Sequence, residues 1–419
     1  MAPNDRFKAI AITLLSALAL PAAAATNAPD LNQFEKLVDA GKLSSAQAAQ
    51  LQEFVLTHPN NNKAHVVLGR YYSFYNLGEL AANEFQAALK LDNSKPDIWM
   101  YLANEKYRHH KLAETQKILD QAEKRFPKYH DIQLAKGNLY LRGGKYAEAA
   151  KYLEKAQASK PSDFEVQVGW AQLCFALKKY PEAIIYADAA LKLKPDCADA
   201  YHVKARALLA LGHRREAFQM LSAGFNCDQL NRDLDTIYLD QAERDKRWGI
   251  ALEPALAIMA IDVNNTTILP TSKDKVISII DQWKKSGATD AHIKDAIDRV
   301  GKYLDRTTHK SRYFFCIGDI YDRFNQPKVA ITYYERGLTI EPAYARAYLR
   351  IGEDMELLYQ PEKALELYKK AQSINPNDLE IVTRLSALEK RLSDEKNNVL
   401  LKWLRGFNFW APSQPPESP

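Results

Sequence analysis

The sequence predicts an all-α fold, a solenoid of repeated helical hairpins. Three observations indicate this fold: a period of 34 residues, small residues at fixed places within the period, and proline at its end. The chain has 419 residues, of which 47% are hydrophobic and 26% are charged. This composition disfavours disordered and fibrous proteins. The net charge of +5 is too small to indicate a nucleic-acid surface, so we expect no nucleic-acid partner.

The first 25 residues have the pattern of an export signal. Arg6 and Lys8 precede an apolar run from Ala9 to Leu20, and the small residues that follow predict cleavage after Ala25. The apolar run is too short to cross a bilayer of about 30 Å as a helix. The alternative is an apolar helix that packs on the rest of the chain. We therefore expect a signal peptide at 1–25, no integral membrane segment after its removal, and a periplasmic or secreted protein.

The 34-residue period begins at Ala28 and runs to residue 265. The other repeats are expected to start at Asn62, Pro96, His130, Phe164, Ala198, Arg232, Ser311 and Ala345. Positions eight, twenty and twenty-seven are each Gly or Ala in seven of the nine repeats. Two helices approach closely only where side chains are this small. Proline closes six repeats, at Pro59, Pro127, Pro161, Pro195, Pro342 and Pro376.

These columns resemble the tetratricopeptide repeat (TPR) family. The residues that match its pattern are Leu68-Gly69 with Tyr72, Trp99, Gly137 with Tyr140, Tyr201, Ile317-Gly318 with Tyr321, Tyr334 and Tyr368. The resemblance implies a right-handed superhelical solenoid of TPR helix-turn-helix repeats. It covers an array at 28–265 and two further repeats at 311–378. The units at 28–61 and 232–265 keep the register but lose most signature residues, and we regard them as degenerate.

The segments outside the repeats have their own patterns. Residues 266–310 predict an irregular helical hairpin capped at Thr289, or alternatively a hinge between two arrays. Residues 379–405 predict C-terminal capping helices. The end of the chain, 406–419, is aromatic and then Pro-rich, and we expect it to be disordered. The aromatic segment from Trp403 to Trp410 could pack on the terminal helix, anchor a partner or insert at a membrane surface.

In this family the first helix of each hairpin lines a concave groove, and position nine of this chain is rich in amides. An amide offers both a donor and an acceptor, which suits the backbone of an extended peptide. A similar asparagine ladder lines the superhelix of the O-GlcNAc transferase family. The predicted peptide-binding groove consists of Arg70, Met100, Asn104, Leu134, Asn138, Val168, Gln172 and Arg206, with the two arginines placed to hold carboxylates. The alternative is that these residues form ordinary solvated surface.

Charged residues gather in the C-terminal repeats. Acidic side chains at positions nine and twelve predict an acidic wall, formed by Asp319, Asp322, Glu353 and Glu356. Arginines lie close by in the sequence, at Arg312, Arg323, Arg346 and Arg350, which favours internal salt bridges. Position five lacks the basic residues that clamp acidic C-termini in chaperone-binding members of the family.

No catalytic, cofactor or metal pattern was found. Gly143-Gly144-Lys145 lacks the flanking residues of a phosphate loop, and His109-His110 lacks the spacing of a metal site. Cys174 and Cys316 are expected to be core thiols. Cys197 and Cys227 end neighbouring helical segments, so they either form a disulfide in an oxidising compartment or remain free.

The sequence therefore predicts a non-enzymatic scaffold that binds a protein or peptide partner as an extended segment in the groove. A second hypothesis is an accessory subunit of envelope polysaccharide export or outer-membrane assembly machinery. No cofactor is expected. The identity of the partner is not determined by a fold that binds many unrelated ligands.

Overall fold

The computed structural model describes residues 30–397, except 42, 44, 76, 264–267 and 305–309. The regular elements of these residues are helices and include no strand, which confirms the all-α prediction. The chain divides into two compact units, Met1–Ile132 and Gln133–Pro419. The predicted signal peptide, the segment from Trp403 to Trp410 and the Pro-rich tail lie outside the described residues.

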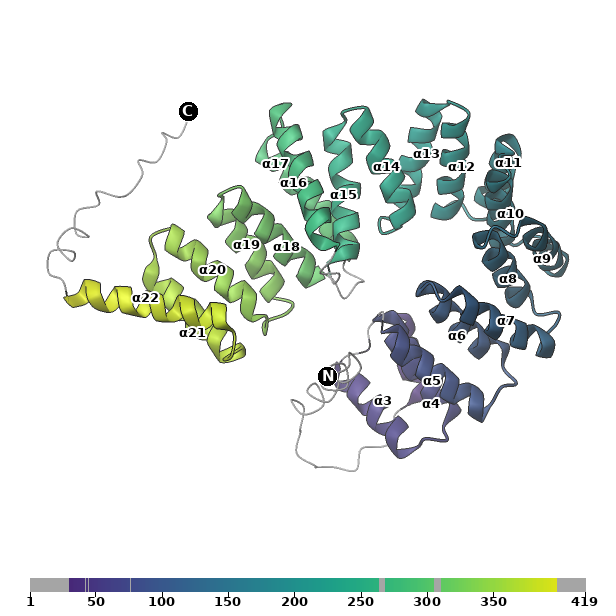
Figure 1. The fold of residues 1–419 in the computed structure, drawn as a ribbon, viewed down its shortest axis with the longest axis horizontal. Helices are drawn as coiled ribbons and strands as arrows, with labels where there is room; N and C mark the ends of the chain where they lie inside the picture. The colour runs from purple at the N-terminus through teal and green to yellow at the C-terminus, as the bar shows by residue number, and fades with distance from the viewer. Residues whose placement is uncertain are drawn as a thin grey trace. The chain divides into compact units, whose positions relative to one another are not determined.

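The first unit is a stack of helices (Figure 1). Its helices are α2 (Leu31–Asp39), α3 (Ser45–Thr57), α4 (Asn62–Phe74), α5 (Gly78–Leu91), α6 (Pro96–Arg108) and α7 (Leu112–Arg125). Helices α2 and α3 both pack on α4, and consecutive helices pack on each other from α4 to α7. The boundary between the units falls within the first turn of α8 (His130–Arg142).

The second unit continues with the same kind of hairpin. Its helices after α8 are α9 (Tyr146–Ser159), α10 (Phe164–Ala176), α11 (Tyr180–Leu193), α12 (Ala198–Ala210), α13 (Arg214–Cys227), α14 (Arg232–Arg244), α15 (Trp248–Asp262), α16 (Leu269–Lys285), α17 (Asp290–Tyr303), α18 (Lys310–Arg323), α19 (Pro327–Leu338), α20 (Ala345–Leu357), α21 (Pro361–Ile374) and α22 (Leu379–Asn397). Consecutive helices pack on each other from α9 to α16 and from α17 to α22, as expected for a solenoid, and α17 also packs on α15.

The expected repeat starts agree with the helix starts. Helices α4, α6, α8, α10, α12, α14 and α20 begin at position one of their repeats, and α18 begins one residue earlier. Local capping explains several of these starts. The side chains of Asn61, Asp163 and Asn231 each accept a hydrogen bond from a backbone N–H in the first turn that follows.

Small residues at position eight make room for the aromatic residue at position twenty-four of the same repeat. A Cβ atom placed on Gly318 would lie 2.6 Å from the ring of Tyr334, and one on Gly352 would lie 2.3 Å from the ring of Tyr368. Where position eight is alanine, as at Ala205, position twenty-four is the smaller Leu221. The columns therefore complement each other in volume within each hairpin.

The irregular hairpin at 266–310 consists of α16 and α17. The Thr289 side chain caps α17 as predicted, by accepting a hydrogen bond from the backbone N–H of His292. A single buried cluster extends from Leu239 on α14 through α16 and α17 to Ile351 on α20. In the structure this hairpin is thus built into the core of the second unit.

A buried carboxylate connects the regular repeats to this hairpin. Asp262, at the end of α15, is only 3% exposed and accepts two hydrogen bonds from Arg232 on α14, at 2.5 and 3.1 Å. Ser272 on α16 donates a further hydrogen bond to it. These bonds compensate the buried charge and hold three helices together.

The last described helix, α22, covers the end of the second unit. Its apolar face packs against Ala364, Tyr368 and Ala371 on α21, and consists of Ile381, Leu385, Leu388 and Leu392. This packing agrees with the capping helix predicted from residue 379 onward. The prediction of further capping residues up to 405 lies beyond the described part of α22.

Candidate functional site

A cavity of about 570 Å³ in the second unit contains three of the predicted groove residues. Asn138 projects into it from α8, and Val168 and Gln172 line it from α10. The turns before α12 and α14 complete its walls. We call this cavity the amide hollow. The Oδ1 atom of Asn138 is buried there without a hydrogen-bond partner. An unsatisfied buried acceptor is costly unless a ligand or water supplies a donor.

The rim of the amide hollow is acidic. Its only lysine, Lys194, lies 4.6 Å from the centre of the Phe164 ring in a cation–π contact. Four carboxylates also line the hollow, those of Glu165, Asp196, Asp199 and Asp228. This excess of negative charge favours a neutral or basic ligand, and it disfavours the acidic peptide that flanking arginines would select.

The remaining predicted groove residues of the second unit are occupied elsewhere. Leu134 is 5% exposed and belongs to the core formed with α9 and α10. The Arg206 guanidinium stacks over the Phe175 ring at 4.1 Å, and burial lowers its pKa. Neither residue lines the amide hollow. The sequence had suggested that Arg206 would hold a ligand carboxylate in the groove. In the structure Arg206 lies outside the amide hollow and does not have this position.

In the first unit, Arg70 and Asn104 line a separate cavity of about 450 Å³. Arg70 is already engaged, because it forms ion pairs with Glu35 (3.0 Å) and Asp39 and lies over the Tyr101 ring. Asn104 is exposed, and Met100 on the same helix is half-buried. The charge of Arg70 is thus compensated within the unit, while the Asn104 amide is exposed.

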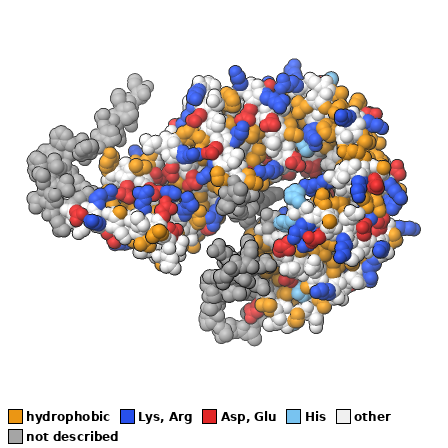
Figure 2. All heavy atoms as spheres, in the orientation of Figure 1, with side chains coloured by type: hydrophobic (Ala, Val, Ile, Leu, Met, Phe, Trp, Pro, Cys, Tyr) orange, Lys and Arg blue, Asp and Glu red, His pale blue; other side chains and the backbone are white. Residues whose placement is uncertain are grey.

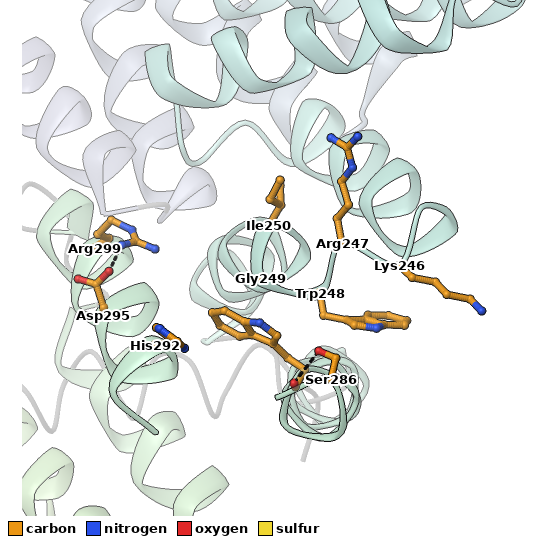
Figure 3. Close-up of a pocket in the computed structure, with 10 residues that line it drawn as sticks. Lys246, Arg247, Trp248, Gly249, Ile250, Ser286, His292, Asp295 and Arg299 are labelled. Carbon is orange, nitrogen blue, oxygen red and sulfur yellow. Dashed lines mark hydrogen bonds and ion pairs between the residues drawn. The ribbon is translucent and has the colours of Figure 1, made fainter. Parts of the chain in front are cut away.

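A third cavity, of about 430 Å³, lies at the irregular hairpin and was not predicted from the sequence (Figure 3). Trp248 begins α15 and Trp283 lies near the end of α16, and both line the cavity. The His292 ring stacks on Trp283 with centroids 6.0 Å apart. Gly249 allows this packing, because a Cβ atom there would lie 2.7 Å from the Trp283 ring. Trp283 lies in the segment that does not follow the 34-residue period. The period therefore did not predict this cavity.

The acidic wall of the C-terminal repeats is largely neutralised by salt bridges, as predicted. Arg350 pairs with Glu353 at 2.5 Å, and Arg391 pairs with Glu356 at 2.6 Å. On the face drawn in Figure 2, acidic and basic side chains are interspersed over α20 to α22. Among the residues that the structure describes, Asp322 and Asp354 of this region form no such salt bridge.

All four cysteines are free thiols in the structure, so a disulfide between Cys197 and Cys227 is not formed. Both residues nevertheless line the amide hollow. Cys197 is buried and Cys227 is exposed, and burial raises the pKa of each thiol. Cys174 and Cys316 are buried, in agreement with the prediction of core thiols.

Within the described residues, no group of three or more His, Cys, Asp or Glu side chains is arranged to hold a metal ion. No helix between residues 30 and 397 that the structure describes combines the length and apolar character needed to span a membrane.

Comparison with known sequences identifies the repeat. Residues 102–164 and 134–199 match one sequence profile described as a tetratricopeptide repeat, and residues 311–344 match a second. The chain is a tetratricopeptide-repeat protein. This TPR fold serves as a scaffold for protein–protein interactions.

Individual relatives are distant. The TPR chain is 28% identical over 112 residues to the inactive peptidyl-prolyl cis-trans isomerase shutdown of Bombyx mori, a match that covers 26% of each protein. It is similar to the crystal structure of a TPR protein from Parabacteroides merdae, with 14% identity, a TM-score of 0.45, and coverage of 64% of this chain and 96% of that one. It is also similar to PilW, a type IV pilus biogenesis factor, with 19% identity, a TM-score of 0.41, and coverage of 49% and 97%.

Proposed function

We propose that this TPR protein is an interaction scaffold whose second unit binds an extended polypeptide segment in the amide hollow. The observation that supports this proposal is the buried Oδ1 atom of Asn138, an acceptor without a donor inside an open cavity. A backbone N–H of an extended peptide would supply that donor. Gln172, which lines the same cavity, offers both a donor and an acceptor for the next peptide group.

The surroundings of these amides suggest which peptides would bind. Val168 and Phe164 offer apolar contacts in the same cavity. The carboxylates of the rim would attract lysine or arginine side chains and repel acidic ones. We therefore expect neutral or basic segments to be preferred over acidic segments.

A peptide library tests this proposal. Extended peptides would be selected against the full chain, and the affinity of the best one measured by fluorescence anisotropy. Asn138→Ala/Gln172→Ala should weaken binding by about tenfold or more, since one hydrogen bond contributes about 1 kcal/mol and an orphaned partner costs more. Gln282→Ala, at an exposed amide on α16, is the matched control.

Peptide chemistry separates backbone recognition from side-chain recognition. N-methylation of the peptide bond that contacts Asn138 should abolish binding, whereas alanine at the same peptide position should be tolerated. Equal affinity for wild type and the double variant would refute the proposed site. Selection of acidic peptides only would contradict the expected charge preference.

We also propose that the protein is exported, on the support of the basic, apolar and small-residue pattern of residues 1–25. The full chain expressed in a Gram-negative host should be recovered from the periplasm, with the mass of a protein that starts at residue 26. Recovery of the uncleaved chain from the cytoplasm would refute the proposal.

A further inference from the structure

A cavity of about 490 Å³ lies among α16, α18 and α20 of the second unit. Most charged side chains on its wall neutralise each other. Lys273 pairs with Asp319 at 2.7 Å, Arg323 pairs with Asp274, and Arg350 pairs with Glu353. Arg346 on α20 also lines the cavity and belongs to none of these three pairs, so it adds one positive charge to the wall.

Two carboxylates in the same cavity are not neutralised. Asp354 is 3% exposed, and its Oδ2 atom has no hydrogen-bond partner. Oδ1 of Asp322 also lacks a partner. In the part of the chain that the structure describes, neither residue forms an ion pair with lysine, arginine or histidine. A buried carboxylate pair of this kind is unstable unless a proton or an external cation is present.

The hydroxyl of Tyr334 shows that donors are scarce. It lies 2.8 Å from Oδ1 of Asp319 and 2.5 Å from Oδ2 of Asp322, yet it has a single proton to donate. Burial, followed by the neighbouring Asp322, raises the pKa of Asp354 to about 8, and burial raises the pKa of Asp322 as well. Without a bound cation, the two carboxylates therefore share a proton at neutral pH and retain one negative charge.

We propose that this cavity binds the guanidinium group of an arginine side chain from a partner polypeptide, at the Asp322–Asp354 pair. Two adjacent carboxylates match the planar fork of a guanidinium, which donates several hydrogen bonds in fixed directions. A metal ion is a poorer candidate, because the described acidic residues form no group arranged to coordinate one.

The apolar part of the cavity suits the stem of the same side chain. Leu357 is 59% exposed and lines the cavity together with Pro270 and Pro327. The methylene groups of arginine would cover this surface while the charged end reaches the carboxylates. This cavity and the amide hollow share no lining residue. An arginine side chain can therefore bind in this cavity when no peptide occupies the amide hollow.

Binding should release the shared proton. The ionisable groups around the pair are Lys273 and Asp274 on α16, Asp319 and Arg323 on α18, Tyr334 on α19, and Arg346, Arg350 and Glu353 on α20. For a site with a pKa of about 8, a cation that displaces the proton binds about tenfold more tightly at pH 7 than at pH 6. An electrostatic contact without proton displacement would show no such change.

The test uses the full chain and three acetylated, amidated tripeptides, Gly-Arg-Gly, Gly-Lys-Gly and the neutral isostere Gly-citrulline-Gly. Affinity would be measured by calorimetry or NMR titration, with dissociation constants expected on the order of 1 mM for so small a ligand. The arginine peptide should bind at least about fivefold more tightly than the other two. Asp322→Asn/Asp354→Asn should abolish this binding, and Asp354→Asn alone should remove its pH dependence.

The control is Asp240→Asn/Asp281→Asn, which makes the same charge change at two exposed positions of the second unit. Folding of every variant would be checked by circular dichroism and thermal melting. Equal binding of the citrulline peptide, undiminished binding by the double variant, or the same loss in the control would overturn the proposal. Equal binding of the lysine peptide would overturn the assignment to guanidinium. None of these outcomes depends on a ligand in the amide hollow.

Discussion

Asp235 on α14 is a carboxylic acid with no exposed surface, and neither of its oxygens has a hydrogen-bond partner. It occupies position four of its degenerate repeat, where the TPR family has a large residue. Burial raises the pKa of Asp235 to about 9, with a smaller contribution from Asp228. We predict that Asp235→Asn stabilises the second unit, because it removes the need to hold a proton at neutral pH.

The size of this effect follows from the pKa difference. An aspartate in the unfolded chain has a pKa near 3.8. One pKa unit corresponds to about 1.4 kcal/mol, so protonation of native Asp235 at pH 7 costs on the order of 4 kcal/mol. Asparagine has the shape of the protonated acid and leaves the same atoms unpaired, so this cost is the main difference between the two proteins.

The contribution of Asp235 to the free energy of unfolding changes with pH in a definite direction. Between pH 3.8 and about pH 9 the native state holds one proton more than the unfolded state. The contribution of Asp235 to the free energy of unfolding therefore falls as the pH rises through this window, by about 1.4 kcal/mol per unit. The advantage of Asp235→Asn should be about 4 kcal/mol larger at pH 8 than at pH 5.

Urea unfolding of wild type and variant, followed by circular dichroism at both pH values, checks this prediction. Asp233→Asn changes an exposed carboxylate on the same helix and should alter stability by less than about 0.5 kcal/mol. An advantage that does not change with pH, or a variant less stable than wild type at pH 8, would refute the reasoning.

Two further predictions concern packing and thiol reactivity. Gly352→Ala should destabilise the C-terminal repeats by about 1–3 kcal/mol in thermal melts, because its Cβ atom would meet the Tyr368 ring at 2.3 Å. Gly143→Ala, whose nearest contact would be 3.5 Å, should be tolerated. Alkylation of native, unreduced protein followed by mass spectrometry should modify the exposed Cys227 first and Cys316 last, because burial raises the pKa of the Cys316 thiol to about 12. Protection of Cys227 equal to that of Cys316 would contradict this order.

The hairpins were predictable because their determinants are local. A helix start such as Asn62 follows from the capping Asn61, one residue earlier. Gly352 and its partner Tyr368 are separated by one inter-helix turn, so the 34-residue period contains both sides of the contact. Because the repeat recurs along the chain, the same local pattern of caps and small-to-large contacts can be recognised in several hairpins.

The candidate site was only partly predictable. The repeat register places Asn138, Val168 and Gln172 on first helices, and the structure brings them to one cavity. The register did not reveal that Arg70 is paired with Glu35, since that contact joins different repeats. The cavity between Trp248 and Trp283 was missed because the irregular hairpin follows no period.

The sequence by itself determined the class of fold, the helix boundaries and the small-to-large pairing within each hairpin, because these depend on neighbours along the chain. Only the tertiary structure decided which charges remain available to a ligand. Asp322 belongs to an acidic pattern that predicts salt bridges, yet among the described residues packing leaves it without a cationic partner, beside Asp354 of the next repeat. Charge compensation depends on distances between different helices, and no one-dimensional pattern contains those distances.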